Sequence, residues 1–292
     1  MSGKIDALIV ARDDMHAEIA MPFLKNKTPV FIDKPLTINK KDIRNIKKTD
    51  LSKHDIVFHL AAISGYPACE ANPHSARTIN VDSTRLLLNY LSKNQILVCA
   101  STTSMYGSSG KELDEMAAVK PVSLYGTTSF ERETLCMNRP NTVAFRFATI
   151  FGISRRMRID LLLNDFTNKA VTERCIVLYD YHSVRTFLHI RDAIDAYMMV
   201  VKNPEPMINE IYNVGANNMN FSKLEVAEEI KKYTGVEIMK SGLEDPDRRD
   251  FIINFDKISS LGFNPKKTLN EGIEELVRLY SWHRTNNLFN TI

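Results

Sequence analysis

An alternation of short apolar segments with longer amphipathic ones constrains the fold of this chain more than any other feature. The apolar runs, each bounded by polar turns, are residues 6–11, 29–33, 55–62, 96–102 and 142–152. We expect each run to form a buried strand. Residues 73–94 and 123–138 have helical periodicity instead. Strands that alternate with helices predict an α/β fold with a doubly wound parallel sheet.

The pattern changes after about residue 155. Residues 209–235 predict a strand, a polar loop and a helix, in which Ser222 and Glu225 form a capping box and Gly235 ends the helix. A last amphipathic helix is expected at 268–283. We therefore divide the chain into residues 1–155, which hold the large sheet, and residues 156–292, a smaller α+β lobe packed beside it.

Composition excludes several classes of protein. The net charge of +3 is small and the lysines are scattered, so we expect neither a nucleic-acid-binding nor a membrane-binding surface. The four cysteines are at least 30 residues apart and form no CxxC pair, which argues against a metal site and a disulfide framework. The first residues have the pattern of neither a signal peptide nor a membrane span, so we expect a reducing, cytoplasmic setting.

Two hydroxyl-bearing residues follow strand 96–102 at the place where such sheets bind ligands. Thr102 ends that strand, and Tyr125 lies near the start of the next helix. A threonine hydroxyl can orient a substrate oxygen while a phenol exchanges its proton, as hydride transfer at a carbinol requires. The simpler alternative is that Thr102 only ends a strand and Tyr125 only packs against the core.

Eight motifs in order give a family resemblance over residues 50–280. They are "DL" at 50–51, "VFHLAA" at 57–62, "INVDST" at 79–84, "STTSMYG" at 101–107, "SLYG" at 123–126, "RFATIFG" at 146–152, "RTFLHIRDAIDAY" at 185–197 and "EIYNVGANN" at 210–218. The chain resembles the extended short-chain dehydrogenases/reductases, specifically the NAD-dependent nucleotide-sugar epimerases and dehydratases. Residues 1–155 would then be a Rossmann-like nucleotide-binding domain, and residues 156–292 the substrate-binding lobe.

The resemblance implies NAD as cofactor and assigns residues to it. Asp50 and Leu51 would flank the adenine, and Asn80 would brace the central helix. The strand end at Leu60, Ala61 and Ala62 would run along the cofactor. Ser129 stands where the family has a lysine that holds the nicotinamide ribose.

The same resemblance implies catalytic and substrate-binding roles. Thr102 and Tyr125 would be the catalytic pair, and Arg185 and Arg249 would bind the diphosphate of a nucleotide-sugar, unless they are structural ion-pair partners. Residues 155–160, "RRMRID", resemble a subset that acts on surface-polysaccharide sugars. The family also often forms homodimers through the helices that hold 79–84 and 123–126.

Two departures from the family predict impaired activity. Ser129 can donate one hydrogen bond to the ribose, but it carries no charge, unless another lysine takes over that role. The first half of the sheet also lacks a glycine-rich loop, because Gly65 is the first glycine after Gly3. Asp13 and Asp14 stand where the loop should be, and their carboxylates would repel a phosphate.

The N-terminal segment has a different resemblance. Residues 1–42, with His16 and the "DKP" motif at 33–35, resemble the end of the nucleotide-binding domain of glucose–fructose oxidoreductase-like (Gfo/Idh/MocA) dehydrogenases. We interpret the chain as a β-α-β segment grafted in front of an epimerase that lacks its own first strand, glycine loop and helix. Residues 5–10 and 29–33 should then be parallel strands beside 55–61.

Two functions remain open from the sequence. One is an NAD-dependent epimerase, dehydratase or reductase of a nucleotide-sugar, with impaired activity and with weak or absent NAD binding. The other is a non-catalytic protein of the same fold, a pseudoenzyme or rearranged gene product that binds a nucleotide-sugar or a homologous subunit. Lineage favours the first, whereas Ser129 and the missing glycine loop favour the second.

Overall fold

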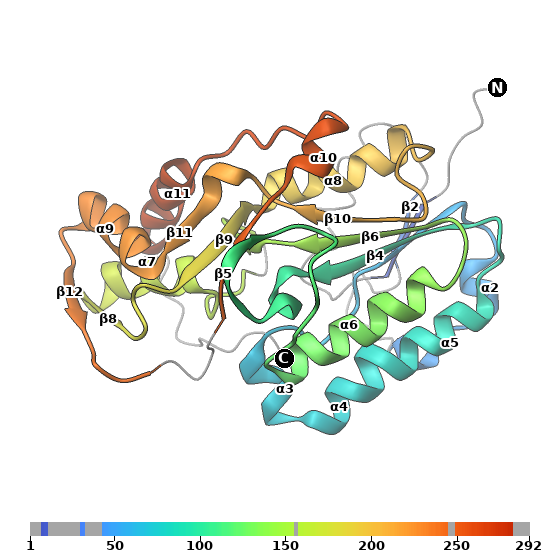
Figure 1. Ribbon diagram of the computed structural model, residues 1–292, viewed down its shortest axis with the longest axis horizontal. Coiled ribbons are helices and arrows are strands. Elements are labelled where there is room, and N and C mark those ends of the chain that lie inside the picture. The colour runs from blue at the N-terminus through green and yellow to red at the C-terminus, as the bar shows by residue number, and fades with distance from the viewer. Residues whose placement is uncertain (1–6, 11–29, 33–42, 155–156, 245–248, 283–292) are drawn as a thin grey trace.

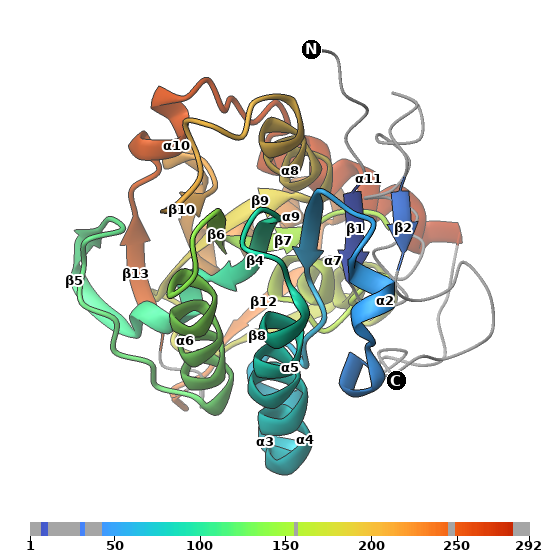
Figure 2. The same ribbon diagram turned by 90° about the vertical axis from the view of Figure 1, so that its right-hand side faces the viewer.

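Six parallel strands form the centre of the molecule, in the order β10, β6, β4, β3, β1, β2 (Figures 1 and 2). The structure is a computed structural model that describes residues 7–10, 30–32, 43–154, 157–244 and 249–282. The strands of the central sheet are β1 (Ala7–Val10), β2 (Val30–Ile32), β3 (Ile56–His59), β4 (Ile96–Thr102), β6 (Thr142–Phe147) and β10 (Glu210–Val214). All five neighbouring pairs are parallel, which confirms the predicted α/β class.

The two N-terminal strands complete one edge of this sheet. β1 pairs with β3, with Ala7 opposite Ile56, and β2 pairs with the other side of β1 (Figure 2). The prediction that both N-terminal apolar runs join the sheet beside residues 55–61 is therefore confirmed for residues 7–10 and 30–32. The segment between them, with Asp13, Asp14 and His16, lies outside the described residues, as does the "DKP" motif.

Helices cover both faces of the sheet. Figure 1 shows α3, α4, α5 and α6 on one face, and α8 and α10 on the other. The bounds are η1 (Ile43–Asn45), α2 (Lys48–Leu51), α3 (Tyr66–Ala71), α4 (Pro73–Arg77), α5 (Ser83–Tyr90), α6 (Leu124–Met137), α8 (Ile190–Lys202) and α10 (Asp256–Ser260). The helix predicted over 73–94 is interrupted by a π-helical turn, η2 (Thr78–Asp82).

The remaining elements form three small sheets and their helices. The strands are β5 (Ser108–Leu113), β7 (Thr149–Phe151), β8 (Cys175–Leu178), β9 (Val184–His189), β11 (Asn220–Ser222), β12 (Glu237–Lys240) and β13 (Asp250–Ile253). They pair as β11-β9-β7, β12-β8 and β13-β5. The helices are η3 (Thr103–Tyr106), α7 (Leu162–Thr172), η4 (Asn217–Met219), α9 (Lys223–Thr234) and α11 (Leu269–Trp282).

Local signals in the second part of the chain behave as predicted. The Ser222 side chain accepts a hydrogen bond from the backbone N–H of Glu225, whose own side chain accepts one from the Ser222 backbone N–H. Gly235 ends α9 with a left-handed φ of 66°. The capping box and the glycine stop are therefore confirmed, and α11 confirms the last amphipathic helix up to Trp282.

One predicted strand is wrong as a single element. The apolar run 142–152 forms two strands, because the chain leaves the central sheet after Phe147. The backbone N–H of Ala148 donates to the carbonyl of Val214 over 3.0 Å, and β7 then pairs with β9 in a different sheet. A continuous apolar run cannot reveal such a change of sheet, since both halves are buried or half-buried.

Aromatic packing fixes α8 on the sheet. The Tyr197 ring lies 5.5 Å from that of Phe58, 5.7 Å from Phe145 and 5.2 Å from Phe147, measured between centroids. Such tilted and edge-on pairs contribute about 0.5–1.5 kcal/mol each beyond their buried area. All four cysteines are free, and none of the described helices is long and apolar enough to cross a membrane.

Candidate functional site

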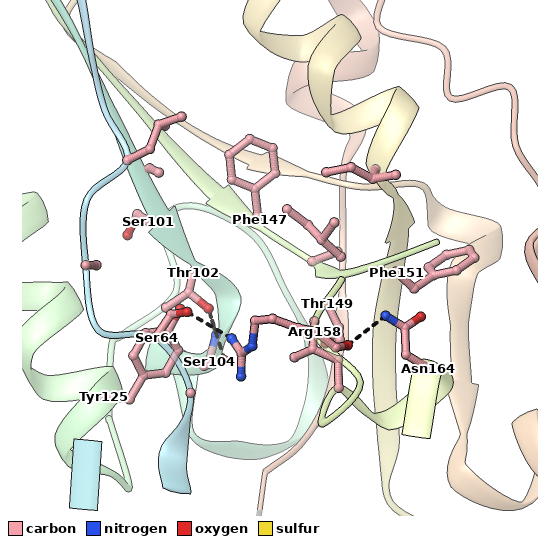
Figure 3. Close-up of a pocket in the computed structure, with 18 of the residues that line it drawn as sticks. Ser64, Ser101, Thr102, Ser104, Tyr125, Phe147, Thr149, Phe151, Arg158 and Asn164 are labelled. Atoms are coloured by element: carbon pink, nitrogen blue, oxygen red, sulfur yellow. Dashed lines mark hydrogen bonds between the residues drawn. The ribbon is translucent and has the colours of Figure 1, made fainter. Parts of the chain in front are cut away.

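A cavity of about 230 Å³ opens at the carboxyl ends of β3, β4 and β6. Its lining combines segments far apart in the sequence: Leu60, Ala62, Thr102, Ser104 and Tyr125 from the first half, and Thr149, Phe151, Arg158, Asn164 and Arg249 from the second. Figure 3 shows Thr102 and Tyr125 on one side of this space and Thr149, Phe151 and Asn164 on the other. The cavity therefore lies where open α/β sheets bind ligands.

The predicted catalytic pair meets at this cavity. Thr102 ends β4 and caps η3, because its Oγ1 accepts the backbone N–H of Ser104 at 3.1 Å. Tyr125 lies in the first turn of α6, which begins after Ser123, whose Oγ accepts the backbone N–H of Gly126 at 3.1 Å. Both side chains line the cavity. The N-caps of η3 and α6 thus place the Thr102 hydroxyl and the Tyr125 phenol at the same rim of the cavity.

A buried ion pair supports this rim. Nη2 of Arg146 on β6 lies 2.6 Å from Oε1 of Glu133 on α6, and Nη1 donates to the Tyr106 hydroxyl at 2.8 Å. The Tyr106 hydroxyl in turn donates to Oδ1 of Asn213 at 2.8 Å. Burial raises the pKa of Tyr106 to about 12, so it stays a neutral donor. The network ties η3, which follows Thr102, to α6, which carries Tyr125.

The cofactor-binding predictions fall into two groups. Leu60 and Ala62 line the cavity, whereas Asp50 and Leu51 do not. Leu51 is completely buried in the core, and Oδ2 of Asp50 accepts the backbone N–H of Lys47 at 2.9 Å. The adenine role of these two residues stays a prediction.

Asn80 connects the loop after β3 to α6. Its Oδ1 accepts the backbone N–H of Ile63 at 2.7 Å, and its Nδ2 donates to the Ile63 carbonyl at 2.9 Å and to Oγ1 of Thr128 at 3.1 Å. The π-helical turn η2 places this side chain between the two elements. Asn80 therefore sets the path of the chain beside the cavity.

Ser129 and Arg132 follow Tyr125 along α6. Ser129 is 1% exposed and is not part of the cavity lining. Arg132 is 3% exposed and does line it. Its Nη1 donates to the Ala61 carbonyl at 3.4 Å and its Nη2 donates to the Ala100 carbonyl. Sequence reasoning missed Arg132, although its position seven residues after Tyr125 places both on one helix face.

The two predicted substrate arginines occupy different positions. Arg249 lines the cavity, and its Nη1 donates to Oγ of Ser104. Arg185 is 4% exposed, lies outside the lining, and donates from Nη1 to the backbone carbonyl of Arg249. The structure thus brings Arg249 to the cavity that Thr102 and Tyr125 line, and places Arg185 outside that lining.

A third arginine was not predicted individually. Nη1 of Arg158 donates to Oγ of Ser64 at 2.8 Å (Figure 3). Nε and Nη2 of Arg158 contact the two carboxylate oxygens of Asp160 at 3.1 and 2.5 Å. The Arg158 carbonyl accepts Nδ2 of Asn164 at 2.9 Å. Gly65 makes the approach possible, since a Cβ there would lie 2.7 Å from Nη2 of Arg158. Only the "RRMRID" motif pointed to this residue.

One end of a dinucleotide site fits the described residues. Thr102 and Tyr125 line the cavity together with Leu60 and Ala62, and two buried polar atoms, Oγ of Ser101 and Nε of Arg132, have no hydrogen-bond partner among the described residues. Polar groups left open at a cavity wall suit the hydroxyls of a ribose. The other end, where a pyrophosphate would sit after β1, begins at residue 11, outside the described residues.

Comparison with known proteins gives consistent matches. The model of the NAD dependent epimerase/dehydratase family matches residues 12–215. An "Uncharacterized UDP-glucose epimerase YtcB" of Bacillus subtilis is 28% identical over 204 residues, which are 66% of this chain and 63% of that protein. The dTDP-D-glucose 4,6-dehydratase of Bos taurus is 25% identical over 257 residues, 81% of this chain and 70% of that protein. The chain thus spans less than two thirds of the Bacillus relative.

Solved structures share the fold. MoeE5 in complex with UDP-glucose and NAD aligns with a TM-score of 0.81 and 22% identity, covering 94% of this chain and 97% of that one. The NAD-dependent NDP-hexosamine 5,6-dehydratase TunA aligns with a TM-score of 0.83 and 19% identity, covering 97% of this chain and 100% of that one. The Rossmann-like fold extends over nearly the whole chain.

Proposed function

We propose that this chain, which belongs to the NAD-dependent epimerase/dehydratase family, binds a nucleotide-linked sugar in the cavity at Thr102 and Tyr125 and oxidises it slowly or not at all. One observation carries the proposal: a threonine, a tyrosine and an arginine, Thr102, Tyr125 and Arg249, line one cavity at the carboxyl ends of a parallel sheet. The printed names of the relatives, which include UDP-glucose epimerase and dTDP-D-glucose 4,6-dehydratase, support a sugar nucleotide as the ligand.

Each residue of the cavity would have a defined task. Bound NAD would supply the hydride acceptor. Tyr125 would take the proton of the sugar hydroxyl, and Thr102 would hold the oxygen that loses it. Arg249 would bind the diphosphate, for which a guanidinium is well suited, and Arg185 would position the backbone of Arg249.

We expect the binding of NAD to be the impaired step. No glycine lies between Gly3 and Gly65, so the pyrophosphate would lose two or three charge-assisted hydrogen bonds of about 1.5–3 kcal/mol each. We expect NAD affinity weaker than about 1 mM. Neutralising Asp13 and Asp14 by changing both to Asn should tighten NAD binding in saturation-transfer NMR titrations. Micromolar binding by the unchanged protein would contradict this reasoning.

The N-terminal strands are consistent with a graft. β1 and β2 pair in parallel, as a β-α-β segment requires. We propose an origin of residues 1–42 in a Gfo/Idh/MocA-like dehydrogenase because of the resemblance of their sequence. Residues 1–155 would be the nucleotide-binding domain, to which β10 and α8 also contribute, and the rest of 156–292 would be the substrate-binding lobe. A role in surface-polysaccharide sugar metabolism, a homodimer and a cytoplasmic location complete the proposal.

A non-catalytic protein is the second candidate function. Ser129 in place of the family's lysine and the missing glycine loop favour it. Such a protein would keep the sugar-nucleotide site and lose turnover, or would pair with an active homologous subunit. The two candidate functions differ in whether the protein converts the sugar, a reaction that would depend on Tyr125.

The deciding experiment uses UDP-glucose and dTDP-glucose as probes. Calorimetry should show binding of at least one, weakened about tenfold or more by Arg249→Ala but not by Arg278→Ala, an exposed arginine of α11. In NMR assays with saturating NAD, Tyr125→Phe should abolish sugar conversion and leave binding intact. Binding without conversion in the unchanged protein selects the non-catalytic function, and no binding of either probe refutes both.

A further inference from the structure

Helix α6 carries a buried cation on the same side as Tyr125. Residues 125 and 132 are seven apart, which is about 20° short of two full helical turns, so their side chains leave the helix in nearly the same direction. Ser129 lies between them, about one turn after Tyr125. Side chains on a helix lean toward its N-terminus, which carries the Arg132 guanidinium toward Ser129 and the cavity.

The contacts of Arg132 are with neutral groups. Nη1 donates to the carbonyl of Ala61, which follows β3, and Nη2 donates to the carbonyl of Ala100, which lies within β4. No carboxylate among the described residues forms an ion pair with this guanidinium, and its Nε is buried without a partner there. Taking a cation out of water without a counter-charge costs several kcal/mol. Burial of Arg132 would therefore lower the stability of the fold if its only role were to connect α6 to the central sheet.

The positive charge of Arg132 reaches into its surroundings. Burial and, to a smaller extent, the charge of Arg132 together lower the pKa of His59 to about 3. His59 lies at the end of β3, directly before Leu60 and Ala61. The positive charge of Arg132 therefore acts at the end of β3, where Leu60 lines the cavity.

We propose that Arg132 supplies, at the nicotinamide-ribose end of the cavity, the positive charge that Ser129 lacks. The guanidinium would donate to the ribose hydroxyls with the Nη hydrogens that its two carbonyl contacts leave available. The inference deepens the proposed function and depends on it, because it assumes that NAD is the ligand of this end. Arg132 is then a cofactor-binding residue that the chain uses in place of a lysine at 129.

The test is a double-mutant cycle between positions 129 and 132. Four proteins are compared: the unchanged protein, Arg132→Gln, Ser129→Lys and the double variant. The binding of NAD and of AMP to each is measured in saturation-transfer NMR titrations. Gln keeps a donor for one carbonyl and removes the charge, and AMP lacks the nicotinamide ribose. Because hydrogen bonds from a charged group are at stake, Arg132→Gln should weaken NAD binding at least tenfold and change AMP binding less than twofold.

Rescue separates binding of the cofactor from a structural role. Ser129→Lys should restore NAD binding at least tenfold when Arg132 is Gln, and should change it less than about threefold when Arg132 is present. Arg132→Lys should keep most of the affinity. A structural contact between helix and sheet would not be rescued by a lysine one turn away.

Arg139 is the matched control. It lies just after α6 and also donates to two backbone carbonyls, those of Ser92 at 2.7 Å and Gln95 at 2.9 Å in the loop before β4, but it does not line the cavity. Arg139→Met should therefore leave NAD binding unchanged. Equal NAD affinity of the unchanged protein and Arg132→Gln overturns the inference and leaves the proposed function standing. Absence of NAD binding in the unchanged protein overturns both the inference and the NAD-dependent function.

Discussion

The buried pair Glu133–Arg146 allows a quantitative test of what stabilises the rim of the cavity at Thr102 and Tyr125. Glu133 is 2% exposed and Arg146 is 3% exposed. Three contacts join them, from Nη2 to Oε1 at 2.6 Å and from Nε to the two carboxylate oxygens at 3.1 and 3.0 Å. Burial opposes the charge of Arg146, but Glu133 raises the pKa of Arg146 above its ordinary value. Arg146 therefore stays charged, and Glu133→Gln would leave this buried cation without its carboxylate partner.

We expect Glu133→Gln to lower the free energy of unfolding by about 3–5 kcal/mol, the usual cost of removing one partner of a buried ion pair. Urea unfolding followed by circular dichroism measures it. Because Arg146 also holds the Tyr106 hydroxyl, the same variant should weaken UDP-glucose binding at the Thr102 rim.

The same helix offers an exposed ion pair as a control. Oε1 of Glu131 lies 2.7 Å from Nη2 of Arg85, but the two side chains are 34% and 50% exposed. Exposed pairs contribute about 0–1 kcal/mol, so Glu131→Gln should cost less than about 1 kcal/mol. Equal losses for Glu133→Gln and Glu131→Gln would refute the reasoning, since the exposed pair lacks both the burial and the three contacts of Glu133–Arg146.

Two further predictions concern stability. His59 is neutral in the fold because burial lowers its pKa from 6.5 to about 3, so the unfolded chain takes up the proton first and stability falls as the pH drops below about 6.5; from pH 7 to 5 this loss should be about 2 kcal/mol. Urea titrations at both pH values should show it disappear in His59→Gln but persist in His74→Gln. In α11, Gly272→Ala should destabilise by about 1–3 kcal/mol despite the better helix propensity of alanine, because the Cβ would lie 2.2 Å from the Phe151 ring. Gly110→Ala, with open space around it, should be close to neutral in the same melting experiments.

The sequence alone determined the class of fold and the place of Thr102 and Tyr125 at one cavity. Strands and helices can be recognised from the local periodicity of their apolar residues. A parallel sheet is expected because the connections between the strands are helical. Thr102 and Tyr125 could be placed at one edge of the sheet because both follow strand ends in this order. The Ser222–Glu225 capping box was equally visible, since all of its partners lie within four residues.

Only the tertiary structure decided which distant groups meet. The break at Ala148 depends on Val214, 66 residues later, and the contact between Ser64 and Arg158 spans 94 residues. Arg132 belongs to the same category, because local pattern places it on the face of Tyr125 but says nothing of the carbonyls of Ala61 and Ala100 around it. Periodicity describes neighbours along the chain, whereas burial and charge at a cavity are created by segments that become neighbours only after folding.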